Sequence, residues 1–142
     1  MQTVYGTTVA VDGDGVLLRG PSASGKSDLA LRLIDAGAAL VADDRTVVAR
    51  DRDAVVASSP AALAGKMEVR GLGIVTLPAV PAAPLKLVVD LDASDAVERL
   101  PPAASTCLLG VDIPVMRLAA FEGSAPAKIR LALRLEPQEI ER

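Results

Sequence analysis

The sequence contains no histidine, no tryptophan and one cysteine, and its only aromatic residues are Tyr5 and Phe121. The absence of histidine excludes Ser/His and Cys/His catalytic arrangements, histidine-based zinc sites and acid–base catalysis by imidazole. Any general base must therefore be a carboxylate, a lysine or a tyrosine. Because the chain is 51% hydrophobic yet nearly free of aromatic residues, its core has to be built from Ala, Val, Leu and Ile.

The chain also lacks an excess of positive charge and long apolar runs. The net charge is -3 and the sequence pI is about 4.9, which argues against nucleic acid or an anionic membrane as the main partner. No apolar run approaches the roughly 18 residues of a membrane span, and the N-terminus lacks the pattern of a signal peptide. Cys107 has no partner for an internal disulfide and lies in an apolar segment, so we expect a packed thiol. These features predict a cytoplasmic protein with one domain over residues 1–142.

The most informative stretch is Gly20–Ser27 (GPSASGKS), which fits the phosphate-binding loop pattern G-x-x-x-x-G-K-[ST] at every fixed position. A buried strand is predicted before it (Gly15–Arg19) and a helix after it (Ser27–Ala36), as the motif requires. In this pattern Lys26 reaches the β- and γ-phosphates, and the Ser27 hydroxyl holds Mg²⁺. The helix N-terminus adds partial positive charge. The other loop residues that would surround the phosphates are Gly20, Pro21, Ser22, Ala23, Ser24 and Gly25.

A second informative point is the end of the short apolar strand Ala38–Ala42, where Asp43 and Asp44 follow. A carboxylate in this position, after a phosphate-loop helix, can approach the metal or the nucleophile. The alternative is an ordinary boundary between a strand and a turn, where aspartate is common. Beside the phosphate loop we favour the functional interpretation.

The remaining chain predicts mostly strands. The charged turn Asp51–Asp53 separates two of them, and Pro78–Pro84 is expected to be a stiff extended connection. The polar segment Asp92–Leu100 could form a helix. A C-terminal helix is expected to begin with Ser124 as N-cap and Pro126 in its first turn. Further strands are expected at Thr3–Val11, Leu85–Leu91 and Gly110–Leu118.

Taken together, these segments resemble the catalytic domain of bacterial HPr kinase/phosphorylase, in the family's order and from about Val4 to Leu133. The phosphate loop is the least family-specific of them. Leu40–Arg45 (LVADDR) matches the family's acidic strand end, and Glu68–Ile74 (EVRGLGI) resembles the family signature. Spacing alone would make Glu68 part of a solvated strand edge with a glycine bulge. The resemblance replaces that interpretation with a functional one.

The resemblance implies an enzyme that uses ATP to phosphorylate a serine of HPr, the small phosphocarrier of the sugar phosphotransferase system, and that can run the reverse phosphorolysis. It implies an α/β phosphate-loop domain of the phosphoenolpyruvate carboxykinase-like type, with a β-rich core, the phosphate-loop helix and a C-terminal helix. It also implies a homo-oligomer, specifically a hexamer. The implied roles are phosphate binding by Lys26, Mg²⁺ binding by Ser27 and Glu68, proton abstraction by Asp44, support of the site by Asp43, and charge stabilisation by Arg99.

Three departures from the family pattern modify these expectations. The phosphate loop begins only at Gly20, so we expect the N-terminal regulatory domain to be absent. Tyr5 stands where the family carries a histidine, which removes a side chain that titrates near neutral pH. The segment Ala119–Gly123 keeps the glycine of the family's phosphorolysis loop but not its basic residues, and Glu122 should repel inorganic phosphate. We therefore expect kinase activity to exceed phosphorylase activity.

Two other functions stay open at this point. One is an ATP-binding regulatory module that is catalytically impaired and acts through protein contacts, which Tyr5 and the altered Ala119–Gly123 segment would suit. The other is a small-molecule kinase, although the chain shows no evident Arg-rich lid.

Overall fold

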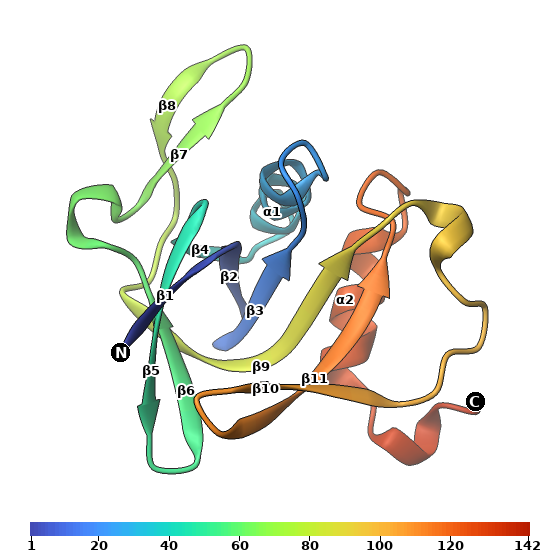
Figure 1. Ribbon diagram of the computed structural model, residues 1–142. Coiled ribbons are helices and arrows are strands. Elements are labelled where there is room, and N and C mark those ends of the chain that lie inside the picture. Colours follow the sequence, from blue (N-terminus) through green and yellow to red (C-terminus); the bar gives the residue numbers. More distant parts are fainter.

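A long strand, β9 (Ala82–Leu91), runs through the centre of the fold and pairs with three other strands (Figure 1). Its first residues pair antiparallel with β6, and its later residues pair in parallel with β3 and with β11. The structure is a computed structural model that describes residues 1–142. It contains a nine-stranded sheet and a separate β7-β8 hairpin. Seven strands of the sheet follow the order β1-β5-β6-β9-β3-β2-β4, and the other two are β11, which pairs with β9, and β10, which pairs with β11.

The other strands are β1 (Gln2–Tyr5), β2 (Thr7–Val11), β3 (Asp14–Arg19), β4 (Ala39–Ala42), β5 (Arg45–Asp51), β6 (Ala54–Ser58), β7 (Lys66–Val69), β8 (Gly73–Thr76), β10 (Ala104–Leu108) and β11 (Val111–Leu118). The helices are α1 (Lys26–Asp35) and α2 (Ala125–Arg134), and three short 3₁₀ turns lie at Ala61–Leu63, Ser94–Ala96 and Pro137–Glu139. This mixed α/β, β-rich architecture with two helices agrees with the predicted fold class at that level.

The hairpin β2–β3 delivers the chain to the phosphate loop, as the sequence predicted. The segment Thr3–Val11 is not one strand, however, because the chain breaks at Gly6 into β1, which pairs with β5, and β2, which pairs with β3 and β4. A Cβ atom at Gly6 would lie 2.7 Å from Leu17 Cδ1 and 2.8 Å from the Leu18 carbonyl oxygen. The close approach of the backbone at this break therefore requires glycine.

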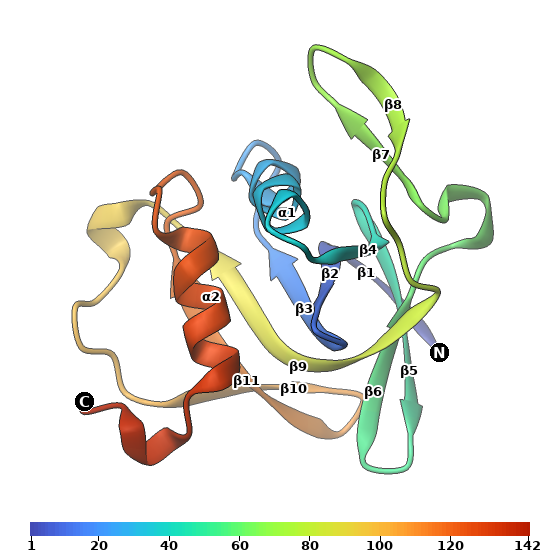
Figure 2. The ribbon, with the colours of Figure 1, turned by 180° about the vertical axis from the view of Figure 1, so that it is seen from behind.

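Both helices cover the same face of the sheet (Figure 2). The predicted C-cap of α1 is confirmed: Gly37 has a φ of 111°, and Gly37 N and Ala38 N donate to the carbonyls of Ile34 and Leu33, which is a Schellman motif. Helix α2 begins directly after Ser124, although the Ser124 side chain makes no capping hydrogen bond. Ile129 of α2 is fully buried, so this helix packs on the domain's own core. Neither helix has the length and apolarity needed to span a bilayer.

The core consists of aliphatic side chains on both faces of the central strands. Because side chains alternate along a strand, Leu18 and Val89 face the helices, whereas Leu17 and Val88 face the layer formed by β5 and β6. Strands β3 and β9 are thus buried on both sides, which explains their continuous apolar sequences. The phosphate loop begins directly after β3, one of these two buried central strands.

Two expectations about the second half of the chain need correction. The segment Asp92–Leu100 contains only the 3₁₀ turn Ser94–Ala96. Nearly all its side chains are exposed, so no other element packs on them, and such packing supplies most of the stability of a helix in a protein. The extended connection Pro78–Pro84 ends earlier than expected, since Ala82 to Pro84 already belong to β9. Pro84 fits there because it lies where β9 changes its partner from β6 to β3.

Cys107 is exposed, which corrects the expectation of a packed thiol. It lies on β10, a strand at the edge of the sheet that the sequence analysis missed. Along β10, Thr106 and Leu108 are partly covered, and Cys107 between them is exposed. The apolar segment at Cys107 therefore belongs to an alternating edge strand and not to the core.

Candidate nucleotide-binding site

The predicted phosphate loop connects the end of β3 to the start of α1. Gly25 precedes the helix with a φ of 99°, a conformation that favours glycine. A Cβ at Gly25 would also lie 2.7 Å from Ala120 Cβ and 3.0 Å from Phe121 Cζ. The glycine that the motif requires at this position thus permits both the loop conformation and the close packing of the Ala119–Glu122 segment against the loop.

Lys26 lies across the mouth of the loop. Its Nζ donates to the carbonyl oxygens of Gly20 at 2.6 Å and Pro21 at 3.0 Å. These bonds hold the ammonium group at the loop, where phosphate oxygens can replace the carbonyls as its acceptors. Within the loop, the Ser24 hydroxyl oxygen is buried without a hydrogen-bond partner.

Asp43 joins the phosphate loop to the end of β4. Its Oδ1 accepts hydrogen bonds from Ser27 Oγ at 2.9 Å and from Thr7 Oγ1 at 3.0 Å. Thr7 is fully buried on β2. The sequence predicted that the acidic strand end would meet the loop, and the structure places Ser27 and Asp43 in direct contact.

Asp44 occupies the centre of a tight three-residue turn. Arg45 N donates to the Asp43 carbonyl at 2.7 Å, and Asp44 has a φ of 66°, a conformation that aspartate adopts more readily than most residues other than glycine. Asp44 N donates to Thr7 Oγ1 at 3.2 Å, and the Asp44 carbonyl accepts from Gly6 N at 2.9 Å. The Asp44 backbone is therefore fixed, while its exposed carboxylate makes no hydrogen bond within the chain.

Tyr5 lies beside this turn. It pairs with Arg45 in the β1–β5 register, and the Arg45 guanidinium carbon lies 5.9 Å from the centre of the Tyr5 ring. The ring is 75% exposed. Tyr5, where the sequence resemblance led us to expect a histidine, is thus next to the acidic turn.

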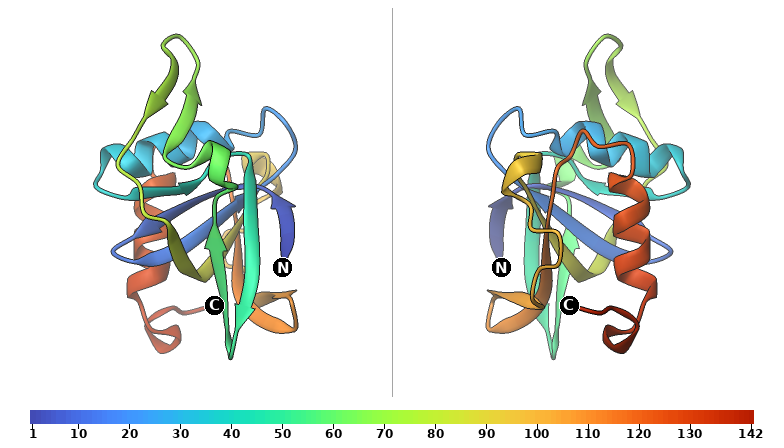
Figure 3. Two further views of the ribbon diagram at one scale, coloured as in Figure 1. Left: turned by 90° about the vertical axis from the view of Figure 1, so that its left-hand side faces the viewer. Right: turned by 90° about the vertical axis from the view of Figure 1, so that its right-hand side faces the viewer.

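The structure does not bring Glu68 and Arg99 together with these residues. Glu68 is exposed on β7, in a hairpin that extends beyond the rest of the fold (Figure 3). Arg99 is exposed in the segment between β9 and β10. Neither side chain forms a hydrogen bond or ion pair, and the chain contains no group of three or more Asp, Glu, Cys or His side chains that could hold a metal.

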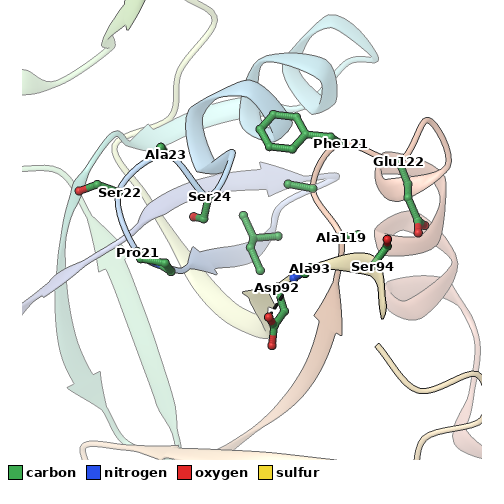
Figure 4. Close-up of a pocket in the computed structure, with 12 residues that line it drawn as sticks. Pro21, Ser22, Ala23, Ser24, Asp92, Ala93, Ser94, Ala119, Phe121 and Glu122 are labelled. Atoms are coloured by element: carbon green, nitrogen blue, oxygen red, sulfur yellow. Dashed lines mark hydrogen bonds between the residues drawn. The ribbon is translucent and has the colours of Figure 1, made fainter. Parts of the chain in front are cut away.

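A pocket of about 730 Å³ opens beside the phosphate loop. In Figure 4 the loop residues line one side, Ser94 and Glu122 lie across from them, and the Phe121 ring closes the end next to α1. The lining residues come from the phosphate loop, from the turn after β9 and from the segment after β11: they are Pro21, Ser22, Ala23, Ser24, Leu91, Asp92, Ala93, Ser94, Ala119, Ala120, Phe121 and Glu122.

Comparison with known proteins identifies the family. Residues 1–133 match the family model described as the HPr Serine kinase C-terminal domain. The chain belongs to this family. The match covers the phosphate loop, the acidic turn and most of α2, and so includes the whole candidate site.

Several relatives and one solved structure support the assignment of this HPr kinase C-terminal domain. The chain is 36% identical to the HPr kinase/phosphorylase of Chlorobium phaeobacteroides over 135 residues, which cover 86% of the chain and 42% of the relative. It is 39% identical to that of Prosthecochloris aestuarii over 135 residues, covering 86% of the chain and 39% of the relative. A structure described as the Hpr(Ser) kinase/phosphatase from Coxiella burnetii is 26% identical, with a TM-score of 0.83, 94% coverage of this chain and 89% of that one. The chain thus spans about two fifths of the length of these two curated relatives.

Sequence reasoning missed two residues that organise the site of this HPr kinase domain. Thr7 bonds to both aspartates, but a threonine in a strand carries no signal of such a role. Arg32 in α1 donates to the carbonyls of Ala120 and Glu122, and its only sequence signal is the spacing to Asp28, with which it forms an ion pair at 2.9 Å. The bonds of Thr7 with the two aspartates and those of Arg32 with the Ala120 and Glu122 carbonyls join segments that are far apart in the chain.

Proposed function

We propose that the domain is an ATP-dependent serine kinase that phosphorylates HPr, with Mg-ATP on the phosphate loop and Asp44 as the general base. The names of the relatives support HPr as the acceptor. The observation that carries the proposal is the acidic turn Asp43–Asp44, which is held against Ser27 of the loop.

The residues at the loop fit a magnesium ion. Mg²⁺ prefers oxygen ligands and is usually bound through one or two carboxylates together with phosphate oxygens and water, so a larger acidic cluster is not required. Ser27 and Asp43 supply a hydroxyl and a carboxylate side by side. Mg²⁺ bound there would offset the charge that develops on the transferred group. Lys26 would exchange its loop carbonyls for the β- and γ-phosphates.

Asp44 suits the role of base because its carboxylate is exposed and unbonded, while its backbone is fixed by three hydrogen bonds. In the proposed step, Asp44 takes the proton of the acceptor serine hydroxyl. The serine oxygen then bonds to the γ-phosphorus and ADP leaves. The exposure of Asp44 allows the serine of a folded partner to approach it.

Glu68 and Arg99 keep their proposed roles in Mg²⁺ binding and charge stabilisation, which require both exposed side chains to reach the loop in the complex. We also propose that the protein is a homo-oligomer, with a hexamer expected from the family resemblance. Light scattering coupled to size-exclusion chromatography would measure the subunit number, and a monomer at all concentrations would refute this point.

Weak phosphorolysis is supported by the charges near the loop. None of the residues that line the pocket is basic, and two of them, Asp92 and Glu122, are acidic. The Glu122 carboxylate is paired with Lys128 Nζ at 2.8 Å, which reduces but does not remove its repulsion of inorganic phosphate. Phosphate-dependent dephosphorylation of phosphoserine-HPr at a rate near that of the forward reaction would contradict this expectation.

The test is to incubate the pure protein with ATP, Mg²⁺ and HPr from the same organism and to read the product by intact-protein mass spectrometry. One added phosphate, mapped to a serine and lost with Asp44→Asn, would support the proposal. ATP binding without transfer would instead favour a regulatory module that acts through protein contacts.

A further inference from the structure

We propose that the pocket beside the phosphate loop holds the base of the bound nucleotide and that Phe121 stacks on that base. The inference rests on the proposed function, because it takes the phosphate loop to hold the phosphates of a nucleotide. It adds a specificity-determining residue and a defined place for the uncharged end of the ligand.

The first argument is the distribution of aromatic residues. The chain has only one Phe and one Tyr, and neither contributes to the core, since Phe121 is 71% and Tyr5 is 75% exposed. A large apolar side chain that is exposed to water and borders a concave site indicates a place where a ligand binds. Phe121 is the only aromatic residue that lines the pocket.

The second argument is that the ring is held in place although it is exposed. Arg32 donates one bond to the carbonyl before Phe121, at Ala120, and another to the carbonyl after it, at Glu122. The Phe121 ring also approaches the loop closely, at 3.0 Å from the place where a Cβ of Gly25 would lie. The backbone on both sides of the ring is thus fixed to the helix that begins the phosphate site, which lowers the entropy cost of stacking.

The third argument is the direction in which a nucleotide would lie. In the sheet order β9-β3-β2-β4, the acidic turn follows β4 on one side of the phosphate-loop strand β3. The pocket lies on the other side, at the ends of β9 and β11. A nucleotide whose terminal phosphate points toward Asp43 and Asp44 therefore extends its base toward Phe121.

The fourth argument is the chemistry of the pocket walls. Half of the lining residues are hydrophobic and none is basic, so the pocket suits a flat, uncharged group better than a second anion. Leu91 and Ala119 supply apolar surface, and Ser94 supplies a hydroxyl that can bond to the edge of a ring. Bases also stack on exposed aromatic side chains in proteins that bind single-stranded nucleic acids.

The experiment compares two ligands that share the phosphates but not the base. Isothermal titration with MgATP and with magnesium tripolyphosphate would be carried out on the wild type, on Phe121→Ala and on the control Leu131→Ala, which shortens an exposed residue on α2. We expect Phe121→Ala to weaken MgATP binding by at least about fivefold and to leave tripolyphosphate binding nearly unchanged. If Phe121→Ala weakened the binding of both ligands equally, or of neither, the inference would be wrong but the proposed function would still stand. Failure of the wild type to bind either ligand would overturn the proposed function as well.

A second variant gives an independent readout. The chain has no tryptophan, so Phe121→Trp creates a single indole reporter at the proposed stacking position. We expect its fluorescence to be quenched by MgATP and not by tripolyphosphate. The same response to both ligands, or no response to MgATP, would contradict stacking at this residue.

Discussion

Ser27 Oγ donates a hydrogen bond of 2.9 Å to Asp43 Oδ1, which ties the phosphate-loop helix to the acidic end of β4. The same Asp43 oxygen accepts a second bond from Thr7, so one carboxylate is oriented by two hydroxyl donors. The proposed magnesium site uses this hydroxyl and this carboxylate. The neighbouring Asp44 carboxylate is exposed and makes no hydrogen bond within the chain.

Replacing Asp44 tests the base. We expect Asp44→Asn to bind MgATP with near-normal affinity and to lose about 10²- to 10⁴-fold in transfer to HPr, which is the usual contribution of general base catalysis. Single-turnover mass spectrometry and isothermal titration would measure the two effects. Near-normal turnover of the variant would show that another residue is the base.

Replacing Lys26 should affect binding and transfer together. Lys26→Ala removes the cation that we place on the β- and γ-phosphates, so both ATP affinity and kcat should fall. Lys26→Arg, which keeps the charge but changes its geometry, should retain more affinity than activity. Unchanged affinity of Lys26→Ala for MgATP would contradict the assignment.

Removing the Thr7 hydroxyl tests the link between the two aspartates. Thr7→Val keeps the shape of the buried side chain but leaves Asp44 N without its acceptor and Asp43 with one donor fewer. We expect a loss of about 1–3 kcal/mol in the free energy of unfolding, measured by urea denaturation, together with slower transfer. Thr7→Ser keeps the hydroxyl and should stay close to wild type. If Thr7→Val were as stable and active as Thr7→Ser, the hydroxyl would have no organising role.

We propose that Arg32 positions Phe121. We expect Arg32→Ala to weaken MgATP binding while sparing tripolyphosphate, because it releases the carbonyls on both sides of the ring. A purely structural role would instead lower the melting temperature and weaken both ligands alike. In the Phe121→Trp background, loss of Arg32 should also reduce the quenching by MgATP.

Gly6 provides a test of the strand break. Gly6→Ala would place a Cβ 2.7 Å from Leu17 Cδ1 and 2.8 Å from the Leu18 carbonyl, and overpacking of this kind typically costs about 1–3 kcal/mol. Gly123→Ala is the matched control, because a Cβ there meets nothing within 4 Å. Equal stability of the two variants in urea denaturation would show that the strand break tolerates a side chain.

Local signals in the sequence predicted the parts of the fold that depend on neighbouring residues. The phosphate loop, helix α1 and the Gly37 cap are encoded within Gly20–Ala38, and all three were found as predicted. The break at Gly6 could not be predicted, because its cause is Leu17 on another strand. The expected helix at Asp92–Leu100 failed for the same type of reason, since no other element offers it a surface to cover.

In the candidate site, too, the residues with a local sequence signal were predicted and those defined by long-range contacts were not. Lys26 and Ser27 were predicted from the loop motif, and the acidic strand end from its place after the helix. Thr7 lies 36 residues from Asp43 in the sequence, and Arg32 lies 88 residues from Ala120. Contacts of that range leave no mark on local composition or periodicity.

The position of β9 between the loop strand and β11 sets the order in which the site can form. The pair Arg19–Asp90, which joins the ends of β3 and β9, closes over 71 residues of sequence. During synthesis the phosphate-loop motif emerges before its neighbouring strand β9 and before the segment that carries Phe121. Pairing over such separations is slow. A nascent chain therefore carries the motif long before it can bind a nucleotide, and ligand binding by the growing chain would mark the completion of the fold.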